Sequence, residues 1–154
     1  MQQFDYDVIF MNQALACARE ALQFGEVPIG ALVVSPHGHI VGSGYNLVEK
    51  NCSQINHAEM RAIEQAGQQQ GDWRLNGHTL YVTVEPCMMC ISLCSLSRIE
   101  RVVFGARSPV FGFSLDKEGV LALYTRQIKN ITEGVLAEPS AKLLKDFFKY
   151  SREK

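Results

Sequence analysis

The sequence predicts an α/β fold of three layers, with helices on both faces of a central mixed five-stranded sheet. Segments with strand character alternate with segments of helical periodicity along most of the 154 residues. Apolar residues make up 47 % and charged residues 20 % of the chain, so it can bury a core. Because the length is that of one domain, we expect residues 1–154 to form a single domain.

The first half of the chain predicts a helix, a hairpin and a second helix. Ile9, Leu15 and Leu22 recur at helical spacing and indicate the first helix. The turn sequence Ser-Pro-His-Gly over 35–38 separates two strand-like runs, which favours a hairpin. A polar segment, 49–56, precedes the second helix. The expected elements are a helix over 8–22, strands over 29–34 and 39–45, and a helix over 57–69.

The second half predicts three strands and two helices. Thr-Leu-Tyr-Val-Thr-Val over 79–84 is the clearest strand, and Pro86 follows where proline favours the first turn of a helix. Pro139 should open the last helix, and 107–119 should be a loop. The expected elements are strands over 79–84, 101–105 and 131–136 and helices over 87–97 and 139–152.

Charge and cysteine content exclude some classes of protein. The chain has 15 basic and 16 acidic side chains and a net charge of −1, which excludes a globally basic nucleic-acid binder. It starts with polar residues rather than a signal sequence, and no apolar run approaches the ~20 residues that span a bilayer. Five cysteines, an odd number, fit a reducing compartment. We therefore expect a cytoplasmic protein that does not contact membranes.

Four residues form the pattern with the most chemical content. Cys87 and Cys90 are three apart, so both thiols lie on one face of a first helical turn, where the helix dipole favours thiolate. Together with His57 they make a donor set that suits zinc, and three protein ligands leave the fourth position to water. Glu59 can converge with His57 only at a helix start, where it would act as a base beside that water.

A structural zinc site is the alternative for the same residues. Cys52 or Cys94 would then supply a fourth ligand, and Cys94 follows Cys90 by one helical turn. A four-ligand site would leave Glu59 without a role, which favours the catalytic interpretation.

These residues resemble a known signature. His57-Ala58-Glu59 followed by Pro86-Cys87-Met88-Met89-Cys90 matches the His-x-Glu and Pro-Cys-x-x-Cys motifs of zinc-dependent nucleobase deaminases. The chain more widely resembles bacterial tRNA-specific adenosine deaminases of the cytidine/deoxycytidylate deaminase superfamily. The resemblance covers nearly the whole chain, in segments 26–31, 46, 79–87, 98–107, 131–136 and 146–148.

The resemblance implies a function and roles for individual residues. His57, Cys87 and Cys90 would bind Zn²⁺, and Glu59 would shuttle protons while adenosine becomes inosine at the wobble position of a tRNA anticodon. The family is usually homodimeric. The residues that match positions around the bound nucleoside are Asn46, Val27, Pro28 and Ala58.

One segment departs from the family. Relatives usually continue the Gly-Ala-Arg that ends at Arg107 with an aspartate, whereas this chain has Ser108. The family uses this region against the anticodon, so Arg107 and Ser108 are candidate RNA contacts whose details differ here. A serine hydroxyl hydrogen-bonds ribose more weakly than a carboxylate does.

The C-terminal segment supplies a separate indication of RNA binding. Residues 142–154 carry five basic and two acidic side chains, a net charge of +3. Lys142, Lys145, Lys149 and Arg152 fall on one stripe of a helix, and we expect this stripe to track phosphates. Leu143, Leu144, Phe147 and Phe148 occupy the opposite side and should pack on the sheet.

Two other functions stay open at this stage. The chain could deaminate a free base or nucleoside of the guanine or cytosine type, which the Arg107-Ser108 junction keeps possible. It could also be a non-catalytic, zinc-stabilised RNA-binding module, against which the presence of Glu59 argues.

Overall fold

A computed structural model describes residues 1–153, so Lys154, counted above in the basic segment, lies outside the described residues. Its centre is a five-stranded sheet in the order β2-β1-β3-β4-β5. β1 is antiparallel to β2 and to β3, whereas β3, β4 and β5 are parallel, so the predicted mixed sheet is confirmed. The strands are β1 (Gly30–Val34), β2 (Ile40–Tyr45), β3 (Thr79–Val84), β4 (Arg101–Ala106) and β5 (Asn130–Thr132).

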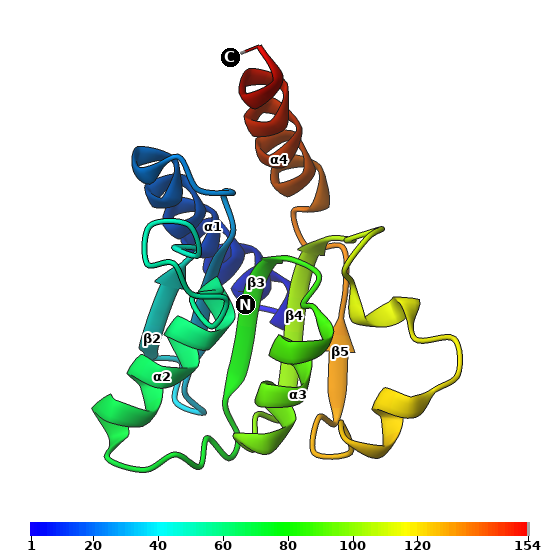
Figure 1. Cartoon of the computed structure of the whole chain (residues 1–154). Helices are drawn as coiled ribbons and strands as arrows, with labels where there is room; N and C mark the ends of the chain where they lie inside the picture. The colour runs from blue at the N-terminus through cyan, green and yellow to red at the C-terminus, as the bar shows by residue number, and fades with distance from the viewer. Residues whose placement is uncertain (154) are drawn as a thin grey trace.

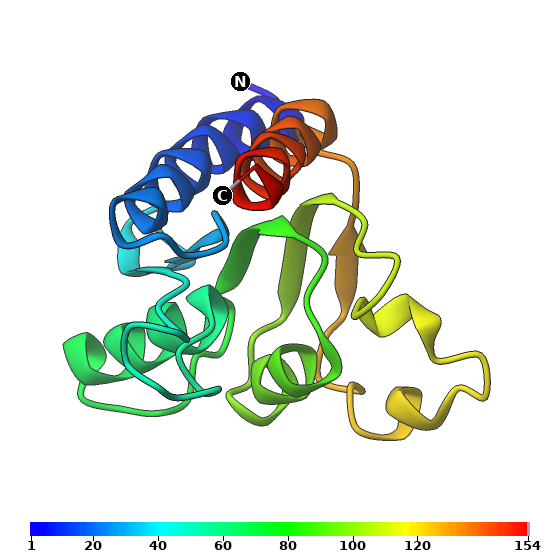
Figure 2. The same cartoon turned by 45° about the horizontal axis from the view of Figure 1, so that its top comes forward.

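Helices cover both faces of the sheet, which confirms the three predicted layers (Figure 2). α1 (Gln3–Ala21) and α4 (Ala137–Arg152) lie on one face, and α2 (Ala58–Gln70) and α3 (Met88–Leu96) lie on the other (Figures 1 and 2). Three short 3₁₀ turns complete the chain: η1 (Leu22–Phe24), η2 (Phe113–Leu115) and η3 (Val120–Leu123).

Strand residues alternate between two hydrophobic cores, as the pleat requires. Val33, Leu80 and Phe104 face α2 and α3, in a core completed by small residues of α2 such as Ala62. Leu32, Tyr81 and Val103 face α1 on the other side. β1 and β3 contribute to both cores and are buried along almost their whole length, which explains their nearly continuous apolar sequence.

The parallel strands decide where the site lies. α2 and α3 begin at the edge of the sheet at which β3 ends, and β1 starts and β2 ends at this same edge. Segments that are far apart in the sequence therefore meet there (Figure 1). In α/β sheets this carboxyl edge of the parallel strands is where ligands bind.

Three predicted elements need correction. α1 begins at Gln3 rather than residue 8, and Ile9 and Leu22, assigned to its apolar face, are exposed. Pro86 lies before the helix, because Cys87 is the N-cap residue of α3. The strand over 131–136 ends at Thr132, because Gly134 has a positive φ of 83° and turns the chain.

The prediction for the last helix was wrong in two respects. α4 starts at Ala137, two residues before Pro139. Its apolar side packs only in part: Leu143, Leu144 and Phe147 are half-buried and Phe148 is 44 % exposed. The reason is geometric, since α4 runs past the end of the sheet into solvent (Figure 1), where no strand lies beneath it. No helix within residues 1–153 has both the length and the apolar character of a membrane span.

Candidate metal centre and active site

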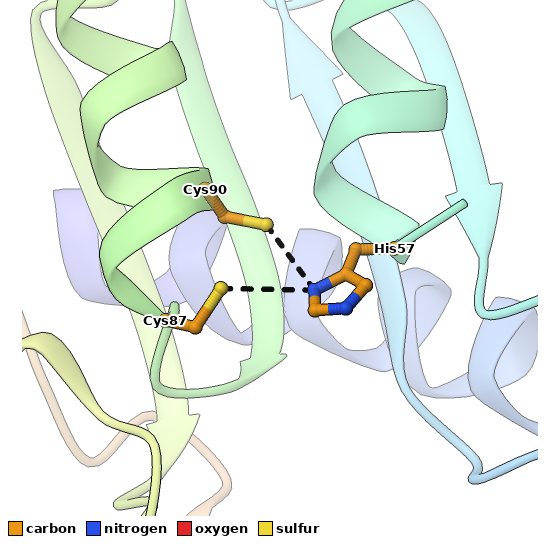
Figure 3. A group of neighbouring side chains, drawn as sticks. All are labelled: His57, Cys87 and Cys90. Atoms are coloured by element: carbon orange, nitrogen blue, oxygen red, sulfur yellow. Dashed lines mark hydrogen bonds between the residues drawn. The ribbon is translucent and has the colours of Figure 1, made fainter. Parts of the chain in front are cut away.

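Two helix starts bring three metal-binding side chains together. His57 is the N-cap residue of α2, Cys87 is the N-cap residue of α3, and Cys90 lies in the first turn of α3. His57 Nδ1 is 3.7 Å from Cys87 Sγ and 3.5 Å from Cys90 Sγ (Figure 3). All three ligand atoms lie within 4.8 Å of one another. The predicted cluster is therefore present.

Hydrogen bonds within the cluster separate the acidities of its two thiols. The Cys90 thiol donates to Cys87 Sγ, and with the His57 ring it lowers the pKa of Cys87 to about 4. The same hydrogen bond, together with burial, raises the pKa of Cys90. The bond to Cys87 also raises the pKa of His57. The lowered pKa favours the thiolate form of Cys87, which is the form of cysteine that binds metal.

The donor set fits zinc. One imidazole nitrogen and two sulfurs are borderline and soft ligands, the combination found in zinc sites. In the part of the chain that the structure describes, the cluster contains these three donors and no fourth. Cys94 is buried within the core beneath α3, and Cys52 is exposed on the loop before α2. The four-ligand structural site is therefore not formed.

Glu59 is a buried acid beside the cluster. It lies in the first turn of α2 and is only 4 % exposed. Burial raises the pKa of Glu59 to about 7, although its own backbone N–H and the His57 ring oppose the rise. A carboxyl with a pKa near neutrality can both accept and release a proton, as a general acid–base requires.

The four residues matched to the nucleoside pocket lie at the same edge of the sheet. Val27 and Pro28 lie just before β1, separated from it by Ile29, Asn46 directly follows β2, and Ala58 opens α2 next to His57. Asn46 is buried, and its N–H donates to the carbonyl of Ile29, the residue before β1, at 3.1 Å.

Sequence reasoning missed two supporting residues here. The buried carboxylate of Glu26 accepts hydrogen bonds from the Asn46 amide (Nδ2–Oε2 3.4 Å) and from the Lys50 N–H (2.7 Å). The Gln54 amide contacts His57 Nε2 at 3.2 Å, on the side of the ring away from the cysteines. Glu26 lies in the segment 26–31 that resembles the family, but nothing in the sequence marks its side chain as buried. No pattern in the sequence marks Gln54.

The candidate RNA contacts have partners within the chain. Arg107 forms an exposed ion pair with Glu133, and its Nη1 donates to Ser114 Oγ at 3.4 Å. Ser108 Oγ accepts a hydrogen bond from the Phe111 N–H at 3.3 Å. Both residues belong to the segment that follows β4 at the site edge of the sheet.

The basic stripe on α4 is present and exposed. Lys142 pairs with Asp146 at 2.6 Å, whereas Lys145, Lys149 and Arg152 make no ion pair within residues 1–153. α4 rises from the end of the sheet at which α2 and α3 begin, but on the opposite face (Figure 1). The stripe and the metal cluster thus lie toward the same end of the molecule.

Comparisons with known proteins agree with the geometry. Residues 5–106 match the family model for the cytidine and deoxycytidylate deaminase zinc-binding region. A tRNA-specific adenosine deaminase of Bacillus subtilis is 42 % identical over 150 residues, covering 96 % of this chain and 92 % of that protein.

Two solved structures share the fold. The structure from a study of A-to-I editing by tRNA:A34 deaminases has a TM-score of 0.80 and 34 % identity, covering 88 % of this chain and 98 % of that chain. A guanine deaminase of Bacillus subtilis has a TM-score of 0.63 and 28 % identity, covering 76 % and 78 %. The classification follows from the family match, the metal cluster and the sequence identity to the Bacillus subtilis tRNA-specific adenosine deaminase: this chain belongs to the cytidine and deoxycytidylate deaminase family, among its tRNA-specific adenosine deaminases.

Proposed function

We propose that this chain, acting as a single domain over 1–154, is a zinc-dependent hydrolase that converts adenosine to inosine at the wobble position of a tRNA anticodon. One observation carries the proposal: a three-donor metal cluster with a buried acid of raised pKa beside it, at the substrate-binding edge of the sheet. The identity to tRNA-specific adenosine deaminases supports the choice of substrate.

His57, Cys87 and Cys90 hold the metal in this proposal. Bound zinc would lower the pKa of a water molecule to about 7 and so supply the nucleophile at neutral pH. The helix N-terminus of α3 favours the thiolate forms of Cys87 and Cys90, and Gln54 fixes the rotation of the His57 ring.

Glu59 moves the protons. Its carboxylate takes a proton from the attacking water and delivers it to N1 of the purine. It then passes the second proton to the amino group on C6, which leaves as ammonia, so that water and adenosine give inosine and ammonia. Burial beside the cluster suits Glu59 to both steps, because its pKa lies near the pH at which it works.

The nucleoside pocket is formed by Val27, Pro28, Asn46 and Ala58 in this proposal. Their common position at the site edge supports it. Glu26 accepts the hydrogen bond of the Asn46 amide, which leaves the Asn46 carbonyl oxygen to accept from the substrate.

RNA binding requires contacts outside this pocket. We assign them to Arg107 and Ser108, which follow β4, and to the basic residues of α4 that form no ion pair within residues 1–153. These α4 residues are Lys145, Lys149 and Arg152. Replacing Lys145, Lys149 and Arg152 by glutamine should weaken binding of an anticodon stem-loop and flatten its salt dependence. Unchanged affinity and salt slope would remove the stripe from the interface.

We infer a homodimer in the cytoplasm. Large apolar side chains are exposed on α3 and on the segment 115–124, and exposed apolar residues of this size are typical of protein interfaces. The exposed residues are Met88, Leu96, Leu115, Val120, Leu123 and Tyr124. Sedimentation of the wild type and of Leu96→Glu tests the assignment, since the variant should be monomeric; a wild type that sediments as a monomer would refute it.

The deciding experiment offers the zinc-loaded enzyme an anticodon stem-loop in parallel with free adenosine, guanine and cytosine. Ammonia release and A-to-G changes on sequencing should appear with the stem-loop. Turnover restricted to free bases would support the guanine- or cytosine-type alternative instead, a possibility that the shared fold of a guanine deaminase keeps worth testing. Glu59→Ala should keep its zinc and lose turnover. A wild type without turnover would point to the non-catalytic RNA-binding module.

A further inference from the structure

A further buried carboxylate, which the chemistry above does not involve, lies just before the metal-binding helix. Glu85 follows β3 directly and is 4 % exposed. It accepts three hydrogen bonds, all from the segment after β4: from the Ser108 N–H (3.3 Å), the Ser114 N–H (3.0 Å) and the Ser114 hydroxyl (2.7 Å). Hydrogen bonds to an ionised acceptor are among the strongest in proteins.

Backbone contacts fasten the same segment to the same place. The Phe113 N–H donates to the Pro86 carbonyl at 2.9 Å, and Gly112 forms an isolated β-bridge with Cys87. A Cβ on Gly112 would overlap the Glu85 carboxylate, so a larger residue there would displace the carboxylate from its present position. The segment 107–115 thus rests on the junction that presents the metal ligand Cys87.

The network continues to a candidate RNA contact. The Ser114 hydroxyl donates to Glu85 and accepts from Arg107 Nη1 at 3.4 Å, while Glu133 pairs with the other end of the Arg107 guanidinium. Glu85 therefore acts on Arg107 through Ser114. Removing the carboxylate would free the Ser114 hydroxyl and leave Arg107 held by Glu133 alone.

The fastened segment lines a hollow that also includes the metal ligand Cys87. Phe111 is 74 % exposed and, with Val110, lines a hollow of about 380 Å³ whose other side includes Cys87 and Met88. Val110 and Phe111 lie between Ser108 and Ser114 in the sequence. Their position depends on Glu85, because its three hydrogen bonds bracket them on either side.

We propose that Glu85 is a positioning residue for RNA: its carboxylate, acting through Ser114, holds segment 107–115 against the metal-binding end of α3 and so places Arg107 and Phe111 at the mouth of the site. This inference rests on the proposed function for its effect on RNA. The anchoring itself does not depend on the substrate.

Hydrogen exchange of the zinc-loaded enzyme tests the anchoring directly. In Glu85→Gln and in Ser114→Ala, exchange of the 108–114 amides should accelerate by about tenfold or more, since charge-assisted hydrogen bonds are lost. Ser114→Thr keeps a hydroxyl and should restore protection. The matched controls are Glu20→Gln on α1 and Ser43→Ala on β2, two exposed positions that should leave these amides unchanged. Exchange within twofold of wild type in both test variants would overturn the proposal, and Ser114→Ala decides alone if Glu85→Gln does not fold.

Kinetics with an anticodon stem-loop test the consequence for RNA. KM should rise about tenfold in Glu85→Gln and Ser114→Ala, while kcat stays within about threefold and zinc remains at one ion per chain. Unchanged KM, or a loss confined to kcat, would refute a role in placing RNA. If the wild type turns over no RNA, the proposed function fails, and hydrogen exchange still decides whether Glu85 anchors the segment.

Discussion

Replacing Asp7 by asparagine should destabilise the fold strongly, although the residue lies on α1, away from the metal cluster. The Asp7 side chain is 3 % exposed and its two oxygens accept from the Arg101 guanidinium, both at 2.7 Å. The Tyr81 hydroxyl adds a third hydrogen bond at 2.8 Å, and Arg101 continues to Thr132 on β5 at 2.9 Å. One carboxylate thus connects α1 with β3, β4 and β5.

The expected loss follows from what Asp7→Asn leaves behind. Removing one partner of a buried ion pair costs about 3–5 kcal/mol, because the other charge stays buried without its counter-charge. Arg101 is 19 % exposed and water can partly solvate it, so we expect a loss at or below the bottom of that range, about 2–3 kcal/mol. For a chain of this length that corresponds to a fall in Tm of about 4–12 °C.

The pH dependence of the loss identifies its cause. Burial alone would raise the pKa of Asp7, but hydrogen bonds from Arg101 and Tyr81 outweigh it and hold the pKa below its usual value. A carboxyl with a lowered native pKa stabilises the fold above its unfolded pKa of about 3.9, and this contribution is lost as the pH falls toward the native pKa. The difference between wild type and Asp7→Asn should therefore be constant from pH 8 to about 5 and shrink below about pH 4.

Urea unfolding of both proteins across this pH range measures the difference in free energy. Asp146→Asn is the matched control, since it makes the same chemical change in an exposed pair with Lys142 and should cost no more than about 0.5 kcal/mol. Equal losses in the two variants, or a difference that already shrinks between pH 8 and pH 5, would refute the assignment of a buried charge pair.

Three further predictions concern the site and the core. Zinc binding at pH 7 to protein stripped of metal by a chelator should release at least one proton, because the hydrogen bond to Cys87 and burial raise the pKa of the Cys90 thiol and keep it protonated until metal binds. Calorimetry in buffers of different ionisation enthalpy counts the released protons, and a count of zero would contradict the ligand assignment. Glu59→Gln should retain one zinc per chain and lose about 10²–10⁴-fold in kcat, whereas turnover within tenfold of wild type would remove Glu59 as the proton shuttle. Gly30→Ala should destabilise by about 1–3 kcal/mol in urea unfolding, because its Cβ would overlap the Ala14 carbonyl of α1. Gly67→Ala, whose Cβ has no neighbour nearer than 3.5 Å, is its control, and equal stabilities of the two variants would refute the steric account.

Elements with a local signal were predictable from the sequence. β3 was predicted to the residue, because a run of β-branched and aromatic residues is bounded by polar and turn residues. The strand predicted over 131–136 was too long for a physical reason. Val135 is apolar because it is buried against α1 from a turn, not because it belongs to a strand. An apolar residue in the sequence predicts burial, but burial alone does not distinguish a strand from a packed loop.

The metal ligands could be predicted, but the residues that support them could not. The three-residue spacing of Cys87 and Cys90 at the start of one helix predicts that both bind the metal. Glu26, Gln54 and Glu85 carry no comparable signal, since what defines them is a partner brought close by folding: Glu26 and Lys50 are 24 residues apart, and Glu85 and Ser114 are 29 apart. Buried carboxylates in a sequence look the same as exposed ones.

The metal ligands and the segment 107–115 also differ in how freely their residues can be changed. The metal ligands and Glu59 come from helix starts whose helices are packed on the central sheet, so a change there disturbs the core or the chemistry. Segment 107–115 contributes Phe113 to that packing, where its ring lies edge-on to Phe104, and is otherwise fastened through Glu85 and the backbone of Pro86 and Cys87. Side chains between the fastening points, such as Phe111, can change without moving a metal ligand. The metal chemistry and the contacts that segment 107–115 makes can therefore change independently of each other.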